Sequence, residues 1–110
     1  MKTKAKVNGI PWRMNQTEAA YAKYLEGLRI GRIIHRWDFE PVKLRLADRT
    51  YYSPDFRVIL PDGTIEFHEV KGFWRDDARV KIKVAAAQHP YVFVAVQKAA
   101  SGWKREFFSA

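Results

Sequence analysis

The chain of 110 residues contains no cysteine. Disulfide bonds, thiolate nucleophiles and cysteine-ligated zinc sites are therefore excluded. No apolar run approaches the ~20 residues that a membrane-spanning helix needs, which predicts a protein without a membrane span. Residues 1–8 are basic and lack the apolar stretch of a signal peptide. Together these absences predict a cytoplasmic protein.

Acidic residues are in the minority, because 12 Asp and Glu stand against 20 Lys and Arg, for a formal net charge of +8. A basic excess of this size favours a polyanionic partner such as nucleic acid. A basic protein with no nucleic-acid role is the alternative. With 47% hydrophobic residues, the chain is long and apolar enough to bury a core. We therefore predict a single domain over residues 14–110, preceded by a basic arm over residues 1–13.

The start of the domain carries helix signals. Asn15 is a good N-cap, Glu18 follows three residues later as in a capping box, and Gly31 ends the helical pattern. A second helix is expected to begin at a cap, Asp76 or Asp77, and to end near residue 88. The predicted strands cover residues 33–40, 42–46, 50–60, 65–71, 91–97 and 103–108. The predicted class is α/β (α+β): a mixed sheet of about five strands flanked by helices, in the order α-β-β-β-α-β-β.

Two neighbouring predicted strands carry an acidic pair and a lysine. Side chains alternate along a strand, so Glu69 and Lys71 should point to one face and Val70 to the other. The turn expected at residues 61–64 pairs the two strands and brings Asp55 close to Glu69 or Val70, within reach of one ion shared with Glu69. Mg²⁺ prefers oxygen ligands and is usually held by one or two carboxylates. Asp55, Glu69 and the Val70 carbonyl are therefore candidate metal ligands.

A lysine beside such an ion suits the hydrolysis of a phosphodiester. The Lys71 amine can orient or deprotonate the attacking water, or stabilise the transition state. The alternative is a cross-strand ion pair on a solvated face, which stabilises a fold by only ~0.2–1 kcal/mol. His68 alternates with Glu69 along the strand, so we expect it to face away from the site.

Glu18 is a second candidate for the same chemistry. It lies at the end of the apolar helical stripe formed by residues 21, 22, 25 and 28, which points it towards the sheet. From there it could act as a catalytic acid or bind the same metal or a second one. Its alternative role is the capping box, and the two roles are compatible in part.

Several basic residues are candidate contacts to nucleic acid. Arg75, Arg79 and Lys83 are four residues apart and share a predicted helix face. A phosphate track and an ordinary solvated face fit this pattern about equally well. Trp74 could stack on an unpaired base or pack locally. The remaining candidates are Lys81 near the site and Lys4, Lys6 and Arg13 in the basic arm, which either contacts phosphates or is a solvated tail.

These ordered motifs resemble the PD-(D/E)XK nuclease superfamily. The matching segments are Glu18, Tyr52-Ser53-Pro54-Asp55-Phe56, Pro61-Asp62-Gly63, Glu69-Val70-Lys71-Gly72, Phe73-Trp74 and Asp76-Asp77. The closer resemblance is to phage Holliday-junction resolvases of the endonuclease I type. The chain as a whole also resembles a family of small uncharacterised proteins from phages and prophages.

The resemblance implies a restriction-endonuclease-like core and a structure-selective DNA endonuclease that depends on Mg²⁺ or Mn²⁺, with no small-molecule cofactor. Asp55 and Glu69 would bind the metal, and Lys71 would be the catalytic lysine with Glu18 as the helix acid. It also implies a homodimer, because resolving a four-way junction needs two symmetric cuts, and the host bacterial cytoplasm if the chain is phage-encoded. A less selective nickase, a single-strand or RNA nuclease, and a non-catalytic DNA-binding accessory of recombination or packaging are the alternatives, because one fold serves many substrates.

Overall fold

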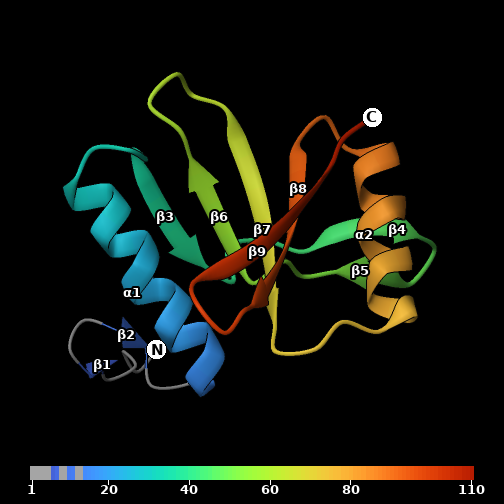
Figure 1. The fold of residues 1–110 in the computed structure, drawn as a ribbon. Helices are drawn as coiled ribbons and strands as arrows, with labels where there is room; N and C mark the ends of the chain where they lie inside the picture. Colours follow the sequence, from blue (N-terminus) through green and yellow to red (C-terminus); the bar gives the residue numbers. More distant parts are fainter. Residues whose placement is uncertain (1–5, 8–9, 12–13) are drawn as a thin grey trace.

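The computed structural model describes residues 6–7, 10–11 and 14–110. Its centre is a five-stranded mixed sheet in the order β3-β6-β7-β8-β9, in which only β7 and β8 pair parallel (Figure 1). The strands of this sheet are β3 Arg36–Phe39, β6 Phe56–Ile59, β7 Ile65–Lys71, β8 Val92–Lys98 and β9 Trp103–Phe108. The other elements are α1 Gln16–Ile30, α2 Asp76–Gln88, and the short strands β1 Lys6–Val7, β2 Ile10–Pro11, β4 Leu44–Ala47 and β5 Thr50–Tyr52.

The α+β class and the mixed five-stranded sheet are confirmed, but the expected order of elements is wrong. From α1 onwards the order is α-β-β-β-β-β-α-β-β. The single strand expected over residues 50–60 is two strands, β5 and β6, which belong to different sheets. Pro54 lies between them, and because proline has no N–H to donate to a ladder, the chain can leave one sheet there and enter the other. The strand expected over residues 33–40 is shortened to β3, since Ile33 and Ile34 belong to the turn after α1.

Helix α1 begins and ends as its sequence predicts. The Glu18 N–H donates to Asn15 Oδ1 at 2.8 Å and the Asn15 N–H donates to Glu18 Oε1 at 3.0 Å, which completes the capping box. Gly31 is the C-cap residue. Helix α2 differs from the expectation at its start, because its N-cap residue is Arg75. Asp76 and Asp77 lie inside the first turn instead, where carboxylates interact favourably with the helix dipole.

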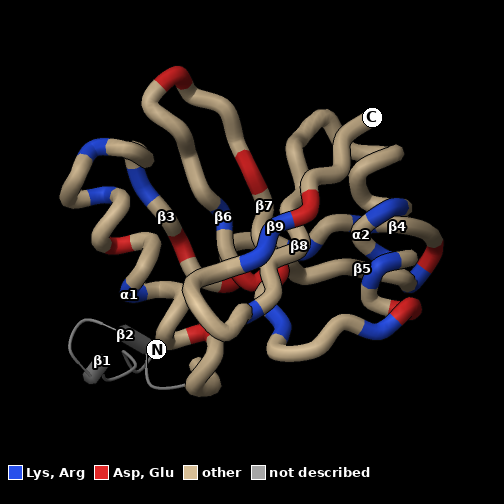
Figure 2. Tube along the Cα trace, in the orientation of Figure 1, with Lys and Arg blue, Asp and Glu red and all other residues tan. Residues whose placement is uncertain are grey.

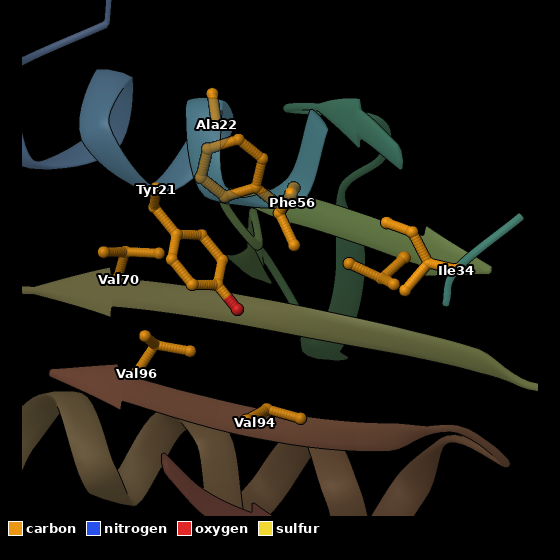
Figure 3. Packing of buried hydrophobic residues seen from close by; sticks show 9 residues of the cluster. Tyr21, Ala22, Ile34, Phe56, Val70, Val94 and Val96 are labelled. Carbon is orange, nitrogen blue, oxygen red and sulfur yellow. The ribbon is translucent and has the colours of Figure 1, made fainter. Parts of the chain in front are cut away.

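The two faces of the sheet are covered by different elements. Helix α1 covers one face, where its Tyr21 packs against Phe56 of β6 and Val70 of β7 (Figure 3). Helix α2 and the β4–β5 hairpin cover the other face, around Phe67 and Phe93 (Figure 1). Strand β8 is buried on both faces, as its nearly continuous apolar sequence predicts. Alternation along β7 therefore sends Glu69 towards the α2 face and Val70 towards the α1 face.

Phe56 is the centre of the core between α1 and the sheet. Its side chain is fully buried, and its ring centroid lies 5.5 Å from that of Tyr21, 5.9 Å from that of Trp37 and 5.3 Å from that of Phe39. We expect Phe56→Ala to lower the free energy of unfolding by about 3–5 kcal/mol, because it leaves a cavity that these rings cannot fill. Urea unfolding measures the loss. Phe107→Ala, at a position that is 59% exposed, is the matched control and should change stability far less.

The N-terminal segment falls mostly outside the described residues. Lys4 and Arg13 lie outside them, and of Lys6 only the backbone is described, in the antiparallel pair that β1 makes with β2. The role expected of these three residues in binding nucleic acid is therefore still a prediction. Within the described part of the chain, no helix is both long and apolar enough to cross a membrane.

Candidate metal and nucleic-acid site

Asp55 is held between two strands at the start of β6. On one side its backbone carbonyl accepts a hydrogen bond from the Glu40 N–H at 2.7 Å. On the other side its carboxylate oxygen Oδ2 accepts one from the Val70 N–H at 2.8 Å. The register of β6 on β7 pairs Phe56 with His68, so Asp55 comes opposite Glu69, one of the two partners that the sequence predicts. The carboxylate of Asp55 thus takes the place of a ladder partner for β7 and is fixed at the strand end.

Glu69 is buried on the α2 face, with 9% of its surface exposed. Tyr52 from the end of β5 donates its hydroxyl to Glu69 Oε1 at 3.0 Å. Lys71 Nζ lies 3.4 Å from Glu69 Oε2, while 43% of the Lys71 side chain is exposed. The predicted common orientation of Glu69 and Lys71 is therefore confirmed. Lys71 and Glu69 form an ion pair, but it differs from the solvated pair considered as the alternative, because the carboxylate is buried and only the lysine reaches solvent.

The two carboxylates repel each other in a poorly solvated place. Burial, together with the nearby charges of Glu69 and Glu18, raises the pKa of Asp55 to about 8. The Val70 N–H and the Lys71 charge act in the opposite direction but do not restore the ordinary value. Without a cation, burial therefore favours the protonated form of the Asp55 carboxyl.

Glu69 shares this behaviour. Burial raises the pKa of its carboxyl, and the Lys71 charge and the Tyr52 hydroxyl partly offset that rise. Burial and the charge of Glu69 also raise the pKa of Tyr52, so the phenol stays protonated and remains a donor. A buried pair of carboxylates that would otherwise bind a proton is a suitable place for a divalent cation, whose charge relieves the repulsion.

The oxygen donors fit Mg²⁺ or Mn²⁺. Along a strand, the N–H and C=O of one residue point to the same neighbouring strand, so the Val70 carbonyl lies on the same side as the Asp55 carboxylate that its N–H contacts. Asp55, Glu69 and this carbonyl are together enough for an ion that keeps several waters. No three Asp, Glu or His side chains in the described part of the chain group around one possible ion. Glu18 is therefore not a third carboxylate of this set; it closes the capping box, and its charge reaches Asp55 at longer range.

A pocket of about 420 Å³ opens beside the acidic pair. Its lining comes from β5, from the end of β7 and from α2: Tyr51, Tyr52, Ser53, Glu69, Lys71, Asp77, Ala78 and Lys81. Asp55 does not line the pocket and lies behind its neighbour on β7, Glu69. The pocket therefore presents two carboxylates, those of Glu69 and Asp77, and two amines, those of Lys71 and Lys81, to whatever enters from solvent.

The basic residues of α2 divide between two sides of the helix. Lys81 lines the pocket, whereas Arg79 makes a bidentate ion pair with Glu106 of β9 and lies over the ring of Phe108. Lys83 is near the same glutamate, since its charge contributes to the lowered pKa of Glu106, after the larger effect of Arg79. Two residues of the expected phosphate track, Arg79 and Lys83, therefore lie near Glu106 of β9, and Arg79 is engaged with that carboxylate.

Of the two aromatic residues after β7, Trp74 takes the packing role that the sequence offers as its alternative. Trp74, the candidate for base stacking, packs into the core under α2, and its indole N–H donates to the Val96 carbonyl at 3.1 Å. Phe73 is 74% exposed. Sequence reasoning missed Phe73 because nothing in a Phe-Trp pair tells which ring faces solvent. It also missed the role of Tyr52, although the alternation in β5 would have placed Tyr52 inward.

His68 lies on the α1 face, away from Glu69, as expected. Its Nδ1 is 2.6 Å from Tyr21 Oη and its Nε2 is 2.8 Å from Glu66 Oε1. Burial lowers the pKa of this imidazole, so the neutral ring accepts from the tyrosine and donates to the glutamate. These contacts satisfy a buried polar group inside the core, and they leave His68 out of the candidate site.

Removing the Tyr52 hydroxyl should weaken metal binding without unfolding the protein. In Tyr52→Phe the ring keeps its packing near Phe93, 6.4 Å between centroids, but Glu69 loses a donor that orients it. Groups that orient a metal ligand typically contribute about 10–100-fold to affinity, and we expect a loss of this size for Mn²⁺. Calorimetric titration with Mn²⁺ measures it. Tyr91→Phe is the matched control, and an equal loss there would show that the effect is not specific to Glu69.

The geometry can therefore do three things chemically: bind a hard divalent cation at the end of β7, place a lysine amine beside it, and admit a polyanion from solvent. The first rests on Asp55 and Glu69, the second on Lys71, and the third on the open pocket with Lys81. A scan against protein-family models and searches of curated proteins and of solved structures found no match to this chain.

Proposed function

We propose that this protein is a metal-dependent endodeoxyribonuclease of the PD-(D/E)XK kind that hydrolyses phosphodiester bonds in branched DNA. The observation that carries the proposal is the buried, mutually repelling pair Asp55 and Glu69 with Lys71 on its solvent side. A structural ion pair has no need of a second buried carboxylate, whose desolvation destabilises the fold unless a cation offsets it. Perturbed carboxylates beside an open pocket are typical of functional sites.

Some residues of the site bind the metal ion, and others position the attacking water and stabilise charge. Asp55 and Glu69, with the Val70 carbonyl, hold Mg²⁺ or Mn²⁺, and Tyr52 keeps Glu69 in the orientation that binding needs. When bound, the ion supplies Lewis-acid stabilisation of the negative charge that develops on the phosphate. Lys71, half exposed and 3.4 Å from Glu69, orients the attacking water and stabilises the same charge from the pocket side. Glu18 adds to the negative potential at Asp55 from the first turn of α1.

The substrate is inferred from charge and from the resemblance of the motifs. A net charge of +8 favours a polyanion, and Lys81 beside the pocket offers it a phosphate contact. Specificity for branched DNA follows from the similarity to junction resolvases. A homodimer would place two such sites for the symmetric cuts that a four-way junction needs.

The test is a cleavage assay with three labelled substrates: an immobile four-way junction, a matched linear duplex and a single strand. Each is incubated with the protein in Mg²⁺ and in EDTA. Paired symmetric cuts in the junction alone, absent in EDTA, are the expected result. Equal cutting of all three substrates would support the nuclease activity and contradict the preference for branched DNA. Tight binding of the junction with no cutting in Mg²⁺ or Mn²⁺ would overturn the enzyme in favour of a DNA-binding accessory.

A further inference from the structure

Phe73 is an aromatic side chain held out in solvent next to the candidate site. It follows Lys71 by two residues, in the segment that joins β7 to α2, and it is 74% exposed. Among the large hydrophobic side chains in the described part of the chain, none has a greater exposed fraction. Two residues of extended chain span at most about 7 Å, so the ring stands within one nucleotide's reach of the lysine.

The backbone at Phe73 is fixed on both sides. Lys71 before it is the last residue of β7, which pairs with β8 up to Gln97. Trp74 after it is anchored in the core and donates its indole N–H to Val96. Phe73 is therefore an exposed ring on a short, tethered segment, and little conformational entropy remains to be lost when the ring meets a partner.

The charges around the ring select the kind of partner. Lys71 precedes it, Arg75 follows it in an exposed position, and Lys81 faces the neighbouring pocket. Basic positions lie both on the segment after β7 and along α2 in Figure 2. An exposed aromatic ring with a basic residue on either side of it in the chain is complementary to single-stranded or unpaired nucleic acid, in which a base face and phosphates are accessible together.

We propose that Phe73 stacks on an unpaired base beside the scissile phosphate and thereby determines the preference for branched over linear DNA. A continuous duplex keeps its bases stacked and offers no base face, so among double-stranded substrates a branch point, where stacking is interrupted, accommodates the ring. This inference rests on the proposed nuclease function and specifies which residue selects its substrate. Phe73 is a specificity-determining residue and takes no part in the chemical step.

The experiment uses the full chain and a four-way junction that carries 2-aminopurine at the branch point, with Ca²⁺ in place of Mg²⁺ for the fluorescence measurement. The wild-type protein should change the 2-aminopurine fluorescence on the junction and leave a linear duplex with the same label unchanged. Phe73→Ala should lose most of that change, and in Mg²⁺ its ratio of junction to duplex cleavage should fall at least about tenfold. Phe73→Tyr keeps a ring and should restore both.

Phe107→Ala is the matched control, because Phe107 is also a highly exposed phenylalanine but lies on the α1 side of β9. The inference is overturned if Phe73→Ala keeps the fluorescence change and the junction preference, or if Phe107→Ala loses them equally. Failure of the proposed function looks different: the wild-type protein then cuts no substrate at all. A wild-type protein that cuts junctions but shows no fluorescence change overturns the role of Phe73 and leaves the nuclease in place.

Discussion

Lys71→Ala is expected to lower the rate of DNA cleavage by about 10²–10⁴-fold, the range that a positioned acid, base or electrostatic group contributes. The amine is 3.4 Å from Glu69 and faces the pocket, so its loss removes the positively charged side chain beside the acidic pair. Single-turnover cleavage of the labelled junction with saturating enzyme measures the chemical step directly. Because 43% of the Lys71 side chain is exposed, the variant should keep its fold, which thermal unfolding checks.

Two further variants sharpen the result. Lys71→Arg keeps the positive charge but cannot give up a proton at working pH. Partial activity in Lys71→Arg assigns an electrostatic role, and a loss equal to that of Lys71→Ala assigns proton transfer. Lys23→Ala, at an exposed position of α1, is the control for a general loss of basic charge. Cleavage by Lys71→Ala at the wild-type rate would refute the assignment of the site.

Asp55→Asn is expected to abolish metal-dependent cleavage and, without metal, to make the protein more stable. Groups that merely orient a metal ligand contribute about 10–100-fold to metal affinity or activity. Loss of a ligand itself should therefore lower the cleavage rate by more than about 10²-fold. The amide still offers an oxygen to the Val70 N–H but carries no charge to desolvate. At pH 8 in EDTA, the midpoint temperature of unfolding should rise by at least about 4 °C.

The pH dependence of that gain has a defined sign. The folded protein holds the Asp55 proton up to a pKa of about 8, whereas the unfolded chain releases it near 3.8. The metal-free wild type therefore loses stability as the pH rises from about 4 to 8, and Asp55→Asn lacks this loss. The difference between variant and wild type should be larger at pH 8 than at pH 5. Added Mg²⁺ should stabilise the wild type and not the variant.

Asp62→Asn is the matched control for this measurement. Asp62 is an exposed turn residue whose pKa is lowered by the Thr64 N–H, so the same change of charge should bring no gain at pH 8. An Asp55→Asn variant less stable than the wild type at pH 8 would mean that the Asp55 carboxylate is ionised and well solvated. Burial and repulsion would then no longer explain why Asp55 and Glu69 should bind a cation.

The sequence by itself was sufficient wherever a local pattern controls the structure. The Asn15 and Glu18 capping box, the Gly31 helix end and the turn that Asp62 and Gly63 make between β6 and β7 are as predicted, because each depends on a few neighbouring residues. The turn also limits the register, which is why Asp55 could be placed close to Glu69 or Val70 from the chain alone, and the structure decides for Glu69. Period-two alternation then gave the common face of Glu69 and Lys71.

Only the tertiary structure decided what depends on contacts between distant segments. Three such features follow from which surfaces meet. Residues 50–60 divide between two sheets, Trp74 is packed while Phe73 stays exposed, and Arg79 pairs with Glu106. The same holds for the electrostatics of the site. A sequence shows that Asp55 and Glu69 are acids, but desolvation by the packed chain is what raises the pKa of each and makes the pair a place for a cation.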